Sequence, residues 1–257
     1  MASATGIPDV NNLRGTGEDE PLLGRRGDAS QQDGTSLLWN LYLGTAAVAQ
    51  AGIWVLAAIV WGSIFSHDLI FMSAHPLLNS AGLLLVVQAA LVLQPTHTPE
   101  QKRAGTIAHA IFHFFGVSAL TSGLVIIEIN KARSGHRAEF ASAHARLGLI
   151  FYILIYAQVF VGFTQYWVQS IYGGEEKAKK IWKYHRVGGY ITATLGLATV
   201  CAATWTTYVV NVLSTQKWAV ILASVITLVG VVPRIKLQKL GLRRDGENSE
   251  GRIRLDL

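Results

Sequence analysis

The chain has 257 residues and a mass of 27.9 kDa, and 51% of the residues are hydrophobic whereas only 15% are charged. Ordinary soluble domains carry about 25% charged residues, and the mean hydropathy here is +0.34. This composition excludes a soluble enzyme, a secreted disulfide scaffold and a nucleic-acid-binding domain. We attribute the net charge of +6 to the Lys and Arg residues that set the orientation of a membrane protein. The single cysteine, Cys201, has no internal disulfide partner.

Six apolar runs follow one another along the chain. Each of the first five is close to or above the ~20 residues that a helix needs to cross a hydrocarbon core of roughly 30 Å, and the sixth is shorter. None shows the alternation of a barrel strand. The runs cover residues 37–65, 75–93, 106–129, 144–168, 185–209 and 218–232. The sequence therefore predicts an all-α membrane protein with six transmembrane helices, four of which form a central bundle.

Polar tails of residues 1–36 and 236–257 flank a membrane domain of residues 37–235. The first tail has a composition typical of disorder and lacks the apolar stretch of a signal peptide. Most of the 22 Lys and Arg residues fall in the tails and in the second and fourth connections, so the positive-inside rule places both termini in the cytoplasm. Residues 18–23 resemble an acidic dileucine sorting signal, which favours an endosomal, vacuolar or lysosomal membrane over the plasma membrane. The alternative interpretation is that these are two leucines in a polar tail without a sorting function.

Four of the eight histidines begin consecutive apolar runs or lie within a turn of their starts: His75, His109, His144 and His185. Any one alone fits an interfacial histidine, but ionisable groups at membrane depth are costly and usually face the bundle interior. The topology pairs His75 with His144 near the non-cytoplasmic face. It pairs His109 with His185 near the cytoplasmic face, roughly 27 Å away along the helices. Two such pairs are what two bis-histidine haems need, and an iron with both axial positions filled suits electron transfer.

Other residues near these histidines leave alternatives open. His113 lies one turn from His109 on the same helix face, so it is a second candidate ligand, a neighbour of the ligand, or a packed histidine. Phe115 and Tyr156 are candidates for aromatic side chains between the two pairs. Glycines recur in the spans, where they serve either close helix packing or clearance for a flat macrocycle; they are Gly82, Gly116, Gly123, Gly148, Gly188, Gly189 and Gly196.

The motifs around the histidines resemble the cytochrome b561 family of transmembrane electron-transfer proteins. The resemblance covers residues 37–235. The Lys-Tyr-His motif ending at His185, together with Phe140 four residues before His144, is most similar to the stand-alone six-span reductases of that family. The resemblance rests on His-Pro-Leu from His75, His-x-x-x-His from His109, His-x-x-x-Gly from His144 and Lys-Tyr-His ending at His185.

The resemblance implies two haem b groups, one held by His75 and His144 and the other by His109 and His185. It also implies electron transfer from cytoplasmic ascorbate, or a similar reductant, to monodehydroascorbate or a ferric chelate across the lipid membrane, and a homodimer. Basic side chains on each side would attract these anions. They are Lys102, Arg103, Lys183 and Arg186 on the cytoplasmic side, and Arg133, His136, Arg137 and Arg146 on the other.

Two departures from the family pattern put the electron donor in question. The second span ends in Val-Leu-Gln-Pro-Thr instead of a Tyr-Arg pair, and Ala145-Arg146 follow His144 instead of Ser-Trp. The oxidase and flavin-dependent ferric-reductase type is disfavoured, because its histidines lie two to a helix and this chain has no Gly-rich dinucleotide-binding segment. The alternative from another class is a haem-free transporter or scaffold whose histidines line a proton or metal path.

Overall fold

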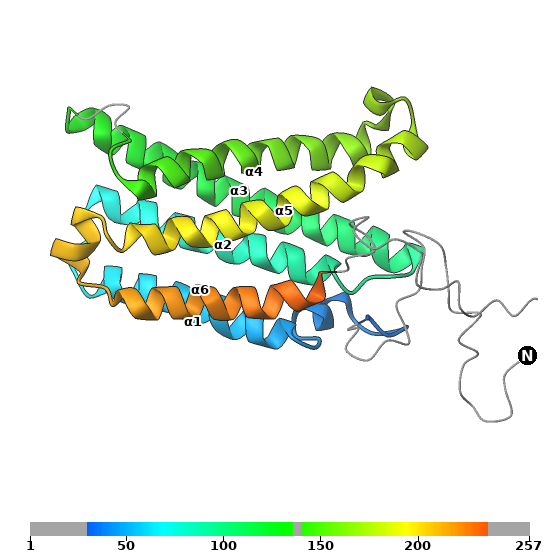
Figure 1. The fold of residues 1–257 in the computed structure, drawn as a ribbon, viewed down its shortest axis with the longest axis horizontal. Coiled ribbons are helices and arrows are strands. Elements are labelled where there is room, and N and C mark those ends of the chain that lie inside the picture. The colour runs from blue at the N-terminus through cyan, green and yellow to red at the C-terminus, as the bar shows by residue number, and fades with distance from the viewer. Residues whose placement is uncertain (1–29, 136–139, 236–257) are drawn as a thin grey trace, which may run out of the picture.

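A computed structural model describes residues 30–135 and 140–235 of the chain. Within these ranges the secondary structure is helical, with six long helices (Figure 1). They are α1 (Ala46–Phe65), α2 (Ala74–Leu93), α3 (Pro99–Arg133), α4 (Ala143–Trp167), α5 (Glu175–Ala203) and α6 (Lys217–Val231). Short helical turns lie between or beside them: Leu37–Leu41, Phe71–Ser73, Gln169–Tyr172, Val209–Leu213 and Val232–Arg234. The predicted all-α membrane fold is confirmed.

The long helices run antiparallel to their neighbours in the chain and lie along one common direction (Figure 1). The closest pairs are α2 with α3, α4 with α5, and α1 with α6, and α2 also contacts α1 and α5. We call the end of the bundle where α1 begins and α6 ends the terminal end; it also holds the α2–α3 and α4–α5 connections. The opposite, distal end holds the other three connections (Figure 1).

Five of these helical segments are long and apolar enough to cross a membrane, and α5 is the exception among the six. Its first turns, from Glu175 to Arg186, are rich in Glu, Lys and Arg, so its apolar part is short. The predicted boundaries shift accordingly. Helix α3 begins at Pro99, where Thr98 and Gln101 form a capping box, and α5 begins at Glu175. The first predicted span is divided, because a separate turn, Leu37–Leu41, precedes α1.

Small residues let α1 and α6 approach closely. A Cβ atom added to Gly230 would collide with the backbone of Ala49, and one added to Gly52 would collide with Thr227. The hydroxyl of Thr45 also donates to the carbonyl of Gly230, at 2.8 Å. Because lipid provides no hydrophobic force between spans, close packing of this kind is what holds such a pair together.

Residues 30–45 pack against the terminal end of the bundle, although residues 30–36 are predicted to belong to the polar tail. The backbone N–H of Gln31 donates to the carbonyl of Pro95, and the buried side chain of Asn40 donates to the carbonyl of Val92. Arg234 is also buried there, and its guanidinium donates to Gln94 and to carbonyls of the first segment and of α2. The predicted sorting signal at 18–23 lies outside the described residues.

Candidate functional site

His75 and His144 face each other at the distal end. His75 lies in the first turn of α2 and His144 in the first turn of α4, and their ring centroids are 6.1 Å apart with an interplanar angle of 85°. Nδ1 of His75 lies 2.9 Å from the carbonyl of Gly123 on α3, and Nδ1 of His144 lies 2.9 Å from the carbonyl of Thr199 on α5. A carbonyl oxygen only accepts, so each Nδ1 carries the proton and each Nε2 keeps its lone pair.

His109 and His185 form a second pair toward the terminal end, on α3 and α5. Their ring centroids are 6.5 Å apart with an interplanar angle of 80°. Nδ1 of His109 lies 2.8 Å from the carbonyl of Ala89 on α2, whereas Nδ1 of His185 is buried without a hydrogen-bond partner. The ring of His185 lies against Gly162 of α4, where an added Cβ would come within 2.9 Å of its Cε1.

The spacing between the two levels can be followed along α2 and α3. His109 and His185 lie about three turns inside their helices, because α3 and α5 begin before the apolar runs do. On α3, His109 belongs to the terminal pair while Gly123 supports the distal pair. The helical rise places these two positions roughly 20 Å apart, and the same spacing separates His75 from Ala89 on α2.

The geometry of both pairs fits a metal held between two imidazoles. A metal–nitrogen bond of about 2 Å, plus about 1 Å from each nitrogen to its ring centre, gives roughly 6 Å between the centres of two opposed ligands. The measured separations are 6.1 and 6.5 Å. Metal-binding histidines also typically donate from the other ring nitrogen to a carbonyl or carboxylate, as three of these four do.

Most of the glycines that the sequence left ambiguous serve helix packing. Gly82 and Gly116 bring α2 against α3, since a Cβ on Gly82 would lie 2.8 Å from the carbonyl oxygen of Gly116. Gly196 of α5 lies against Phe151, at 2.8 Å from an added Cβ, and Gly188 lies against the side chain of Gln158. Helix packing therefore explains these positions directly.

The predicted aromatic candidates are exposed, and the aromatic side chains of α4 buried between the two levels are Phe151, 4% exposed, and its neighbour Tyr152. Phe115 is 58% exposed and Tyr156 is 39% exposed, whereas Tyr152 of α4 is only 7% exposed. The hydroxyl of Tyr152 lies 2.6 Å from Oδ1 of Asn79 and 2.8 Å from the carbonyl of Leu120. Neither Asn79 nor Tyr152 belongs to a motif that the sequence analysis used.

The four cytoplasmic-side candidates lie toward the terminal end, on the two helices that carry His109 and His185. Lys102 and Arg103 are in the first turns of α3, and Arg103 is exposed. Lys183 is exposed with its Nζ 5.0 Å from the ring centroid of Tyr184, and Arg186 directly follows His185 in the chain. The fold thus collects these cations at the end of the bundle where the terminal pair lies.

Two of the candidates for the opposite side are described. Arg133 ends α3 at the distal end, and its guanidinium carbon lies 4.6 Å from the ring centroid of Phe71. Arg146 is exposed in the first turn of α4, and its Nε donates to the carbonyl of Phe140 at 3.0 Å. His136 and Arg137 lie outside the described residues.

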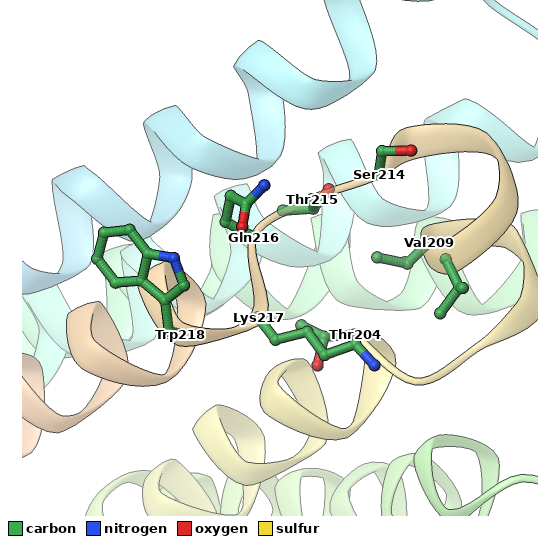
Figure 2. A pocket seen from close by; sticks show the side chains of 8 residues that line it. Thr204, Val209, Ser214, Thr215, Gln216, Lys217 and Trp218 are labelled. Atoms are coloured by element: carbon green, nitrogen blue, oxygen red, sulfur yellow. The ribbon is translucent and has the colours of Figure 1, made fainter.

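An open pocket also lies at the distal end, in the α5–α6 connection (Figure 2). It contains none of the predicted site residues. It is lined by Thr204, Val209, Val210, Ser214, Thr215, Gln216, Lys217 and Trp218. Ser214 has a φ of 49°, so the connection turns sharply there.

The fold and the facing imidazoles define an α-helical membrane protein with two histidine pairs stacked along one bundle. The chain belongs to the eukaryotic cytochrome b561 family, a family of haem-binding membrane proteins, which it matches over residues 74–210. This range contains all four paired histidines.

Curated relatives agree with this assignment. The chain is similar to the transmembrane ascorbate-dependent reductase CYB561 of Homo sapiens, with 31% identity, and to those of Ovis aries and Bos taurus, with 29% identity each. Each match covers 122 residues, which is 48% of this chain and 47% of the relative. The chain therefore spans about half the length of the curated relatives that it matches.

Proposed function

We propose that this protein transfers electrons across a membrane, from cytoplasmic ascorbate or an analogue to monodehydroascorbate or ferric iron on the opposite side. Two haem b groups would serve it, one at His75 and His144 and one at His109 and His185. The observation that carries the proposal is the pair of opposed imidazole sets, 6.1 and 6.5 Å between ring centroids, at two levels of one bundle. The names of the relatives support ascorbate as the reductant.

Haem held by these histidine pairs would supply one-electron exchange. The protein orients the histidines and attracts the charged substrates. Three of the four histidines are held by backbone carbonyls, so their rings are already oriented. Lys102, Arg103, Lys183 and Arg186 attract the ascorbate monoanion to the terminal end. Arg133 and Arg146, with His136 and Arg137, serve the acceptor at the distal end.

The topology belongs to the same proposal. The membrane domain of residues 37–235 crosses the lipid six times, with α5 as the fifth span, and both termini are cytoplasmic. The basic connection before α5 and the basic C-terminal tail support this orientation through the positive-inside rule. We place the protein in an endosomal, vacuolar or lysosomal membrane, as a homodimer.

The decisive experiment is an optical spectrum of the purified chain, oxidised and then reduced with ascorbate, together with a haem count per chain. We expect two b-type haems that ascorbate reduces to a large extent. Two haems that only dithionite reduces would remove ascorbate as the donor and keep the cofactor assignment. Folded protein without haem would overturn the proposal and favour a histidine-lined transporter.

A further inference from the structure

Side-chain hydrogen bonds from Asn79 and Tyr152 lie beside the distal histidine pair. Asn79 lies one turn after His75 on α2, and its Nδ2 donates to the carbonyl of His75 at 2.8 Å. The same Nδ2 lies 3.2 Å from Nδ1 of that ring. Since Nδ1 uses its proton toward Gly123, it does not accept from Asn79, and the amide packs against the edge of the ring at this point.

The side-chain oxygen of Asn79 accepts a hydrogen bond from a residue of α4. Tyr152 places its hydroxyl 2.6 Å from Oδ1 of Asn79 and 2.8 Å from the carbonyl of Leu120, so its proton is shared between acceptors on α2 and α3. Tyr152 lies roughly 12 Å along α4 from His144, on the side toward the terminal pair. One hydroxyl thus joins the helix that carries His144 to the helix that carries His75.

Gly123 makes this arrangement possible. A Cβ at that position would collide with Nδ2 of Asn79 and lie 3.4 Å from the carbonyl oxygen of His75. The backbone of α3 therefore comes close enough to accept from His75 while Asn79 packs over it. Among the described residues, no side-chain nitrogen or oxygen of this network is buried without a hydrogen-bond partner, in contrast to Nδ1 of His113 and of His185.

We propose that Asn79 and Tyr152 are positioning residues for the distal haem, fixing the ring of His75 and the spacing between α2 and α4. This inference rests on the proposed function, because it assumes that a haem binds between His75 and His144. A firmly held Nδ1–H bond makes an imidazole a stronger donor to the metal. Loosening it weakens His75 as a ligand to ferric iron, so the midpoint potential of the distal haem rises.

The test is a redox titration of the purified full-length protein with the haem content measured in parallel. Tyr152→Phe removes only the hydroxyl, and we expect it to keep both haems, raise the distal midpoint potential and leave the terminal one unchanged. Tyr156→Phe is the matched control, because that hydroxyl bonds to Thr121 of α3, at 3.0 Å, and does not touch Asn79. His144→Ala, which breaks the distal pair, provides the reference titration of the terminal haem alone.

A second variant covers the case in which the single change leaves the Asn79 amide buried without a partner. The double variant Asn79→Leu with Tyr152→Phe removes both polar groups, and we expect the same shift of the distal haem alone. Tyr152→Phe should add no further shift in the Asn79→Leu background, because both residues act through one hydrogen bond.

Three results would overturn the inference or its basis. Equal shifts of both haems, or a Tyr152→Phe titration that matches Tyr156→Phe, would overturn the positioning role while the proposed function stands. Wild-type protein without haem would overturn both together, so the two failures are distinguishable.

Discussion

The rings of His109 and His113 meet edge to face one turn apart on α3, with centroids 4.4 Å apart and planes at 74°. Only His109 also faces His185 and has its Nδ1 on a backbone carbonyl, that of Ala89 at 2.8 Å. Nδ1 of His113 is buried without a hydrogen-bond partner. The tertiary contacts thus favour His109 as the ligand and His113 as its packed neighbour.

This relationship predicts different outcomes for two alanine variants. His109→Ala should lose one haem of two and abolish transfer across the membrane, because His109 is the histidine whose ring faces His185 among the described residues. His113→Ala should keep both haems and shift the spectrum only slightly. The haem count by pyridine haemochrome decides between them. Loss of a haem in His113→Ala with full retention in His109→Ala would reverse the assignment.

The basic residues beside the terminal pair should affect the reductant rather than the haems. We expect Lys183→Gln and Arg186→Gln each to raise the KM for ascorbate by about two- to fivefold, the range of an exposed ionic contact. The effect should shrink as ionic strength rises, since salt screens exposed charges.

Lys179→Gln is the matched control on the same helix. Lys179 is an exposed lysine in the basic stretch before His185, and its Nζ lies 3.0 Å from Oε1 of Glu175. Stopped-flow reduction by ascorbate at two salt concentrations measures all three variants. An equal change in Lys179→Gln would mean that only the overall charge matters.

The amides of Gln50 and Gln88 form a reciprocal pair between α1 and α2. Their hydrogen bonds measure 2.5 and 3.0 Å, and both side chains are buried. Gln50→Leu should destabilise the fold by about 1–3 kcal/mol, because it leaves the amide of Gln88 buried without a partner. The double variant with Gln88→Leu should recover most of this loss. Unfolding in mixed detergent micelles measures both, and additive losses would contradict the pairing.

The glycine contact between α1 and α6 gives a prediction with a control in the same helix pair. Gly230→Ala should cost about 1–3 kcal/mol of stability, because its Cβ would strike the backbone of Ala49 and the helices must separate. Gly62→Ala on α1 meets no atom within 4 Å, so it should be neutral or stabilise the helix by up to about 1 kcal/mol. Thermal unfolding compares the two, and equal stability would show that the contact is unimportant.

Much of this architecture follows from local sequence. Apolar runs near the length of a membrane span predict helices, and their order places His75 and His144 at one end and His109 and His185 toward the other. The structure brings the two rings of each pair close together, with their planes nearly perpendicular. Antiparallel succession is sufficient for this pairing, since helices two apart in the chain point the same way. The helix starts are less predictable, because polar turns such as those before His109 and His185 extend a helix without adding apolar residues.

The remaining features depend on contacts between segments far apart in the chain. Tyr152 meets Asn79 and Arg234 meets Gln94 only after the helices have packed, and no spacing in the sequence indicates either contact. Arg234 reads as a positive-inside charge in the sequence, yet it is buried among carbonyls of two other segments. The helical class, the membrane setting and the four candidate histidines can be predicted from the amino-acid sequence, because hydrophobicity and helical rise act locally. Which ring nitrogen is held, which of two neighbouring histidines faces a partner, and which polar groups support them were decided by tertiary packing, because hydrogen bonds between helices depend on their rotation and register.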